Sequence, residues 1–193
     1  MNEFSTVVAM GHDRSPKIDI LSEGDRMYEA RKIANFLLAH YDADRFDLSN
    51  LRMNKLLYFI HGWGLVELHR GLVRNHFEAW QLGPVVRSVY QAFRCHGDKP
   101  ISEPACYFDY STGDNRSIPY DDIHAKHRLL VQSAFEAHAA HSTADLVAMT
   151  HEPGGPWSQV IAANSSQNTR STRIPDPMIR DYFLLKWGGG RRH

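Results

Sequence analysis

The segment NLRMNKLLYFIHGWGLVELH, residues 50–69, constrains the fold more than any other part of the chain. Its apolar residues recur at the three- and four-residue spacing of a helix and extend around its back face. The residues at the centre of this stripe are Met53, Leu56, Leu57, Ile60 and Trp63. A helix that is apolar nearly all round is usually central to its domain. We therefore predict a central helix, in which Gly62 and Gly64 mark either close approach of another backbone or an early helix end.

The rest of the sequence indicates a mainly α protein. Residues 76–82 (HFEAWQL) alternate in character and predict a short strand or an extended loop. The proline-rich stretch 98–120 predicts a hairpin or an ordered loop. The other helical patterns cover residues 25–41, 85–96, 121–141, 144–150, 158–163 and 177–187. We expect a single compact helical domain of about six helices, with a small β-hairpin or extended loop insertion.

The domain itself is expected to span residues 25–165. Residues 1–24 lack a sustained period and predict a flexible N-terminal arm. Residues 164–175 are rich in Asn, Ser, Thr and Arg and predict a mobile loop. We expect the C-terminal part, 166–193, to consist of loop, helix and flexible tail packed on the same domain.

Charge and cysteine content exclude several classes of protein. Lys plus Arg and Asp plus Glu both number 22, so the formal net charge is zero. This balance argues against a protein whose main task is to bind a phosphate backbone. The sequence contains neither an apolar run of the roughly 18 residues that a membrane span needs nor the apolar block of a signal peptide. Two cysteines, Cys95 and Cys106, make neither a disulfide framework nor a four-ligand zinc site, and we expect a reduced cytoplasmic protein.

The possible reactive groups do not make a convincing active site. Two HxxH pairs share one predicted helix face but lie about 21 Å apart along the axis, too far for one ion, so we interpret them as a solvated polar face. They consist of His124, His127, His138 and His141. Cys95 and His96 are adjacent and cannot face each other on a helix, and Cys95 is interpreted as a small core residue. Next to His151 and Glu152 no nucleophile is available. We therefore predict a protein that is not an enzyme and needs no cofactor or metal.

The large aromatic side chains allow two interpretations. They either pack in the core or form an interaction face, where Trp, Tyr and Arg carry most binding energy. Several stand beside Gly or Pro. These residues are Tyr58, Trp63, Trp80, Tyr90, Trp157 and Trp187.

Three segments together resemble the Panacea domain, the family of SocA-like antitoxins and phage-associated proteins. They are LRMNKLLYFIHGWGL (51–65), FEAWQLGPVVRSVYQAF (77–93) and LVAMTHEPGGPWSQV (146–160). The resemblance covers about residues 27–165. Met53 and Asn54 stand where the family commonly has Leu or Gln, and Gly154-Gly155 is an atypical insertion.

The resemblance implies a non-enzymatic antitoxin that binds a cognate protein toxin encoded by an adjacent gene. An alternative within the family is a proteolytic adaptor that delivers a toxin to a AAA+ protease. DNA binding is not carried over, because no second basic domain is present.

The motif residues either contact the partner or build a scaffold for loops that do. In the second case the toxin-facing surface would lie in the 1–24 arm, the 98–120 loop or the 164–175 loop. The candidate partner-binding residues within the motifs are Lys55, Tyr58, His61, Trp80, Gly83, Pro84, Tyr90, His151 and Trp157.

Overall fold

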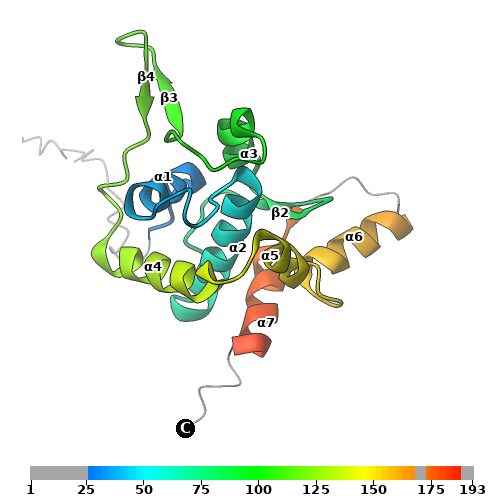
Figure 1. Ribbon diagram of the computed structural model, residues 1–193. Helices are drawn as coiled ribbons and strands as arrows, with labels where there is room; N and C mark the ends of the chain where they lie inside the picture. The colour runs from blue at the N-terminus through cyan, green and yellow to red at the C-terminus, as the bar shows by residue number, and fades with distance from the viewer. Residues whose placement is uncertain (1–25, 168–172, 188–193) are drawn as a thin grey trace, which may run out of the picture.

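Helix α2 (Asn50–Glu67) runs through the centre of the protein, as its all-round apolar sequence predicts (Figure 1). The computed structural model describes residues 26–167 and 173–187. Every residue from Arg52 to Gly62 is buried. The side chain of Ser49 caps the helix by accepting a hydrogen bond from the Arg52 N–H. The expected arm, residues 1–24, and the expected tail, 188–193, lie outside the described residues.

The two glycines of α2 allow close contacts instead of ending the helix. A Cβ added at Gly62 would lie 2.3 Å from the ring of Phe183. A Cβ at Gly64 would lie 3.0 Å from the backbone nitrogen of Leu72. Of the two explanations that the sequence allowed, close approach is confirmed, although the close group at Gly62 is an aromatic ring and not backbone.

The other helices surround α2, and the described chain has seven α-helices where about six were expected. The helices besides α2 are α1 (Ala30–His40), α3 (Arg87–Phe93) with a 3-10 turn (Arg94–His96), α4 (Ala125–Ala139), α5 (Thr143–Thr150), α6 (Pro156–Gln167) and α7 (Asp176–Trp187). The first helix begins five residues later than predicted because the preceding backbone is extended. Tyr28 there accepts a hydrogen bond from Arg74 and donates one to Leu72. Ser142 caps α5 in a capping box with Asp145.

Strands are more numerous than the small hairpin and the short strand or extended loop over 76–82 that were expected, and β1 (Phe77–Trp80) confirms the latter as a strand. A three-stranded antiparallel sheet has the order β2 (Gly83–Val85), β1, β5 (Arg173–Ile174). A separate hairpin pairs β3 (Cys106–Asp109) with β4 (Asp114–Ser117) and confirms the hairpin expected within 98–120. The prediction of a loop over 164–175 is wrong at both ends. Helix α6 continues to Gln167, and β5 pairs with β1.

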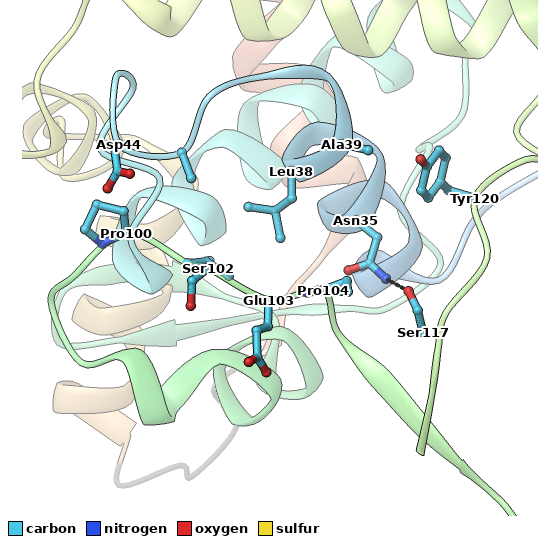
Figure 2. A pocket seen from close by; sticks show the side chains of 12 residues that line it. Asn35, Leu38, Ala39, Asp44, Pro100, Ser102, Glu103, Pro104, Ser117 and Tyr120 are labelled. Atoms are coloured by element: carbon cyan, nitrogen blue, oxygen red, sulfur yellow. Dashed lines mark hydrogen bonds between the residues drawn. The ribbon is translucent and has the colours of Figure 1, made fainter. Parts of the chain in front are cut away.

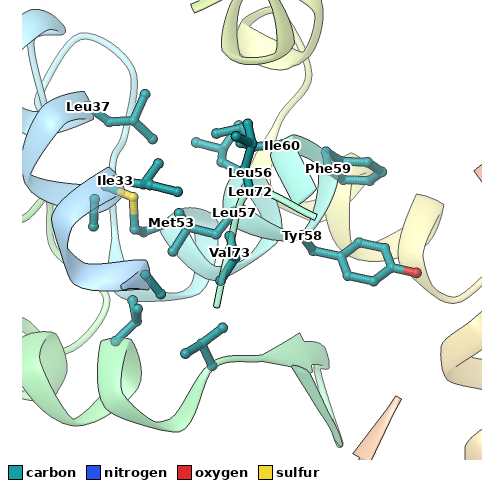
Figure 3. Close-up of a cluster of buried hydrophobic side chains, with 14 of the residues drawn as sticks. Ile33, Leu37, Met53, Leu56, Leu57, Tyr58, Phe59, Ile60, Leu72 and Val73 are labelled. Carbon is teal, nitrogen blue, oxygen red and sulfur yellow. The ribbon is translucent and has the colours of Figure 1, made fainter. Parts of the chain in front are cut away.

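The core is built on the inward faces of α1 and α2. Figure 3 shows Met53 and Leu56 of α2 pointing toward Ile33 and Leu37 of α1. All four are 0% exposed. Leu72 and Val73, which follow α2, are buried in the same cluster. Burial of side chains of this size stabilises a fold by about 1.5–3 kcal/mol each, so this contact fixes α1 against α2.

The histidines of α4 are not a solvated face, and that prediction is wrong for two of them. His127 and His138 are buried, and burial lowers the pKa of each. His127 Nδ1 lies 2.9 Å from the Tyr28 hydroxyl. His138 stacks on Phe59, with its Nδ1 2.7 Å from the Ala134 carbonyl oxygen. An imidazole buried in this way fills space like an aromatic ring while one nitrogen keeps a hydrogen-bond partner.

Cys95 is exposed on the 3-10 turn after α3 and is not the core residue that was expected. The turn leaves the helical path at Arg94 and carries the thiol outward. Among the described residues no group of three His, Cys, Asp or Glu side chains is arranged to hold a metal ion. No described helix combines the length and apolar character that crossing a bilayer requires.

Candidate functional site

The three sequence motifs meet around the side chain of Lys55. This residue lies on α2, is 0% exposed, and donates a hydrogen bond of 2.9 Å from Nζ to the carbonyl oxygen of Pro84 in β2. Gly83 has a φ of +99°, and a Cβ there would lie 2.6 Å from Thr150 Oγ1 and 3.0 Å from Lys55 Cε. Both its φ and its crowded surroundings therefore require glycine at this position. Here α2, β2 and α5 come within contact distance of one another.

The third motif closes this junction through a tryptophan. Trp157, near the start of α6, donates a hydrogen bond of 2.7 Å from its indole nitrogen to the Trp80 carbonyl oxygen in β1. His151 stacks on Trp157, with ring centres 3.8 Å apart and planes inclined by 21°. The turn between α5 and α6 is thereby tied to the sheet. We call Lys55, Gly83, Pro84, Thr150, His151 and Trp157 the motif junction.

The junction holds a positive group in an interior that disfavours charge. Burial lowers the pKa of Lys55 from 10.5 to about 7. Burial lowers the pKa of His151 as well, and the Lys55 charge adds to this effect. A neutral amine near pH 7 has the chemistry of a general base or a Schiff-base nucleophile. Because Lys55 is enclosed on all sides, however, a substrate would have to displace part of the core to reach it.

Two further predicted site residues of α2 also face inward. Tyr58 is 2% exposed, and its ring lies edge-on to Phe77 of β1. His61 is 0% exposed, and its Nδ1 accepts a hydrogen bond of 3.3 Å from the Val73 N–H. Its Nε2 lies 3.4 Å from Asp176 Oδ1 at the start of α7, a contact that lowers the pKa of Asp176. Both residues therefore hold neighbouring elements against α2.

Trp80 and Tyr90 line a hollow on the surface. Their ring centres lie 4.9 Å apart, and Tyr90 is 41% exposed. The hollow has a volume of about 420 Å³ and also includes the exposed Leu82 and the side chain of Asn54. The Asn54 Oδ1 accepts a hydrogen bond from the Val86 N–H, which fixes the start of α3 beside the hollow.

Burial divides the nine predicted partner-binding residues into groups. Trp80, His151 and Trp157 are half-buried, and Tyr90 is exposed. The buried ones are Lys55, Tyr58, His61, Gly83 and Pro84. A buried side chain cannot contact a partner unless the fold opens. For these five residues the burial favours the scaffold alternative. Of the other four, Tyr90 is the exposed one, and together with the half-buried Trp80 it lines the 420 Å³ hollow.

A second hollow, which the sequence did not indicate, lies at the base of the β3–β4 hairpin. Its volume is about 580 Å³ (Figure 2). Asn35 of α1 lines it, is 1% exposed, and forms four hydrogen bonds at the base of the hairpin, one of them from Nδ2 to the Ser117 hydroxyl (3.5 Å, Figure 2). Its Oδ1 accepts from the Ala105 N–H (2.7 Å), and its Nδ2 donates to the carbonyl oxygens of Ala105 and Ile118 (2.9 Å each). Asp44 and Glu103 supply carboxylates to the lining. In the sequence Asn35 lies one helical turn after Arg31, on the face opposite Ile33 and Leu37, so the helical pattern gave no signal of this role.

Comparison with known proteins gives two matches. A family model described as "Antitoxin SocA-like, Panacea domain" matches residues 53–158, which include the motif junction. The chain is also 36% identical over 169 residues to Antitoxin SocA of Caulobacter vibrioides (strain NA1000 / CB15N), and the alignment covers 86% of this chain and 88% of that protein. No solved structure matches the chain significantly.

Proposed function

The chain belongs to the antitoxin SocA-like, Panacea domain family, and we propose that it is an antitoxin that neutralises a cognate protein toxin by binding it directly. The observation that carries this proposal is the match itself, which spans most of the chain and contains the motif junction. The toxin is expected to be the product of an adjacent gene.

Direct binding requires an exposed surface, and a rigid support for that surface favours it. Stable protein complexes bury roughly 1,200–2,000 Å² of total surface and depend on a few aromatic or arginine side chains. The described surface offers such side chains in two places: on the β3–β4 hairpin, where Tyr107, Phe108 and Tyr110 are exposed, and at the 420 Å³ hollow, where Tyr90 is exposed beside Trp80. The hydrogen bonds from Lys55 to Pro84 and from Trp157 to Trp80 hold this region in place. Rigidity before binding lowers the entropy lost on association.

We propose that neutralisation is stoichiometric and not enzymatic. Lys55, whose pKa is lowered to about 7, has the chemistry of a general base, but it is enclosed in the core. Binding through a surface needs no reacting group, whereas an enzymatic reversal would need one that a substrate can reach.

The test is expression of the adjacent gene product alone and together with this protein. The expected result is growth arrest by the first, rescue by the second, and a complex that co-elutes on size exclusion. In a titration with purified components, toxin activity should fall to zero near a molar ratio of one. A harmless neighbour or an absence of rescue would refute the proposal. Rescue at a small fraction of one equivalent, or only through faster toxin turnover in cells, would replace direct binding by an enzymatic or a protease-adaptor route.

A further inference from the structure

The β3–β4 hairpin carries aromatic side chains that the fold does not use. It projects away from the helices, at the top of Figure 1. Tyr107 is 43% exposed, Phe108 is 48% exposed and Tyr110 is 91% exposed. All four residues of β4 are exposed as well. A free two-stranded hairpin gains little stability from aromatic groups that face water on both sides. A group of exposed aromatic side chains on one hairpin therefore indicates an interaction site.

The hairpin is held rigidly at both ends. At its base, Asn35 bonds the backbone of Ala105 and Ile118, as described above. At its tip, Asp109 accepts hydrogen bonds from the Ser111 backbone N–H (3.0 Å) and hydroxyl (2.6 Å). Arg116 Nε lies 3.0 Å from the other carboxylate oxygen of Asp109, which joins the two strands. An arm ordered before binding loses little entropy when it docks, so it suits recognition better than a free loop.

The segment that contains the hairpin is acidic in a chain whose net charge is zero, although two basic residues of α1 contact it: Arg31 at the Cys106 carbonyl oxygen and Lys32 at the Asp122 carboxylate. Residues 98–122 contain six acidic and two basic side chains. The acidic ones are Asp98, Glu103, Asp109, Asp114, Asp121 and Asp122, and the basic ones are Lys99 and Arg116. Asp44 adds a further carboxylate to the 580 Å³ hollow at the hairpin base. A surface of this sign attracts a positively charged partner and repels an acidic one.

We propose that the β3–β4 hairpin, with the hollow at its base, is the element that recognises the toxin, and that it docks on a basic surface with an apolar cleft. The aromatic side chains of the hairpin enter the cleft, and the surrounding carboxylates face lysine and arginine side chains at its rim. This assignment rests on the proposed function, because it names the surface through which that function acts.

The experiment measures binding of the full chain to the purified toxin by calorimetry, together with growth rescue. The test variant is the double substitution F108S/Y110S. The matched control is L129S/L185S, which removes two aliphatic groups of comparable exposure (65% and 84%) from α4 and α7. Loss of two aromatic anchors is expected to weaken binding at least about 30-fold. The control is expected to bind within about 2-fold of the parent. Circular dichroism melts check that both variants fold.

A second variant tests the charge argument without removing any apolar group. Asp114 is exposed, and D114K reverses its sign. It should slow association with the toxin several-fold, and the affinity of the parent should fall as salt rises from about 50 to about 300 mM, since screening weakens such attraction. Normal association by D114K together with salt-independent affinity would overturn the basic-partner assignment.

The outcomes separate the two proposals. If the parent neither binds nor rescues, the proposed function fails and the hairpin assignment fails with it. If the parent binds and F108S/Y110S binds equally well, the hairpin assignment alone is overturned. A third outcome also overturns it: F108S/Y110S converts a dimer of this chain to a monomer on size exclusion and leaves toxin affinity unchanged. The hairpin would then be a contact between two copies.

Discussion

Replacing Lys55 by methionine tests whether burial of the Lys55 ammonium destabilises the folded protein. The pKa of the ammonium is lowered from 10.5 to about 7 because folding removes it from water. Below pH 7 both the folded and the unfolded chain carry the proton, so the folded state bears the full unfavourable desolvation. This destabilisation declines as the pH rises from about 7 and is gone above about 10.5. Stability should therefore increase with pH across this window, in the direction that linkage requires for a lysine with a depressed pKa.

The size of the effect follows from the two pKa values. At 1.36 kcal/mol for each pKa unit, burial of the Lys55 charge destabilises the fold by about 4 kcal/mol at pH 7 and about 2 kcal/mol at pH 9. Lys55→Met removes this effect but leaves the Pro84 carbonyl oxygen without its donor, which costs about 1–3 kcal/mol. We expect K55M to be more stable than the parent at pH 7 by about 1–3 kcal/mol, and this advantage to shrink by about 2 kcal/mol at pH 9.

The assay is urea unfolding of the parent and of K55M at pH 7 and pH 9. Lys99 is exposed, and K99M serves as the control for loss of one lysine, with an expected change within about 0.5 kcal/mol at both pH values. The contributions of other titrating groups to the free energy of unfolding are the same in variant and parent, so they cancel in the difference. The reasoning is refuted if K55M is less stable than the parent and the difference does not change with pH. Lys55 would then be charged and well solvated in the folded protein.

Three further substitutions test contacts elsewhere in the fold. Gly62→Ala places a methyl group against the ring of Phe183 and should destabilise the protein by about 1–3 kcal/mol in thermal unfolding; an unchanged melting temperature would mean that α7 is free to shift. Asn35→Ala should accelerate amide exchange in residues 105–118 at least about 10-fold while exchange in α2 stays slow, and equal exchange in both regions would contradict the role of Asn35 as a clamp. Trp157→Phe keeps a ring for stacking but loses the hydrogen bond to Trp80, and urea unfolding should show a loss of about 1 kcal/mol; a loss no larger than that of a surface substitution would show that this bond contributes little.

The sequence predicts best those elements whose apolar pattern is long. The all-round apolar character of residues 50–69 predicts the central helix to within two residues, and the pattern over 144–150 predicts α5 to within one residue. Strand β5 has two residues, Arg173 and Ile174, and no periodic pattern can reveal a strand of that length. Its existence depends on pairing with β1, which is remote in sequence.

Two residues that the sequence offered as possible reactive groups, His138 and Cys95, show the same limit, because the sequence did not indicate whether they are buried. His138 looks like any polar helix residue in the sequence, and only the packing of α4 on Phe59 shows that it is buried. Cys95 looks apolar, yet the 3-10 turn after α3 carries it to the surface. In both cases tertiary contacts, and not the polarity of the side chain, decide whether the residue is buried. A prediction from the local sequence therefore assigns the wrong environment.

The aromatic residues show why sequence alone does not distinguish a core side chain from an interface side chain. Tyr58 and Tyr110 have identical side chains, but one is 2% exposed and the other 91% exposed. The motifs that identify the family include Tyr58, Lys55 and Trp157, which hold α2, the sheet and the α5–α6 turn together. Substitutions there are expected to change stability with little effect on intrinsic affinity for a partner. Substitutions at the exposed end of the hairpin are expected to do the reverse, since Tyr110 contributes little buried area to the fold. Measuring both quantities on both sets of variants therefore separates the scaffold from the recognition surface, and a hairpin variant that lost stability but kept affinity would reverse this division of roles.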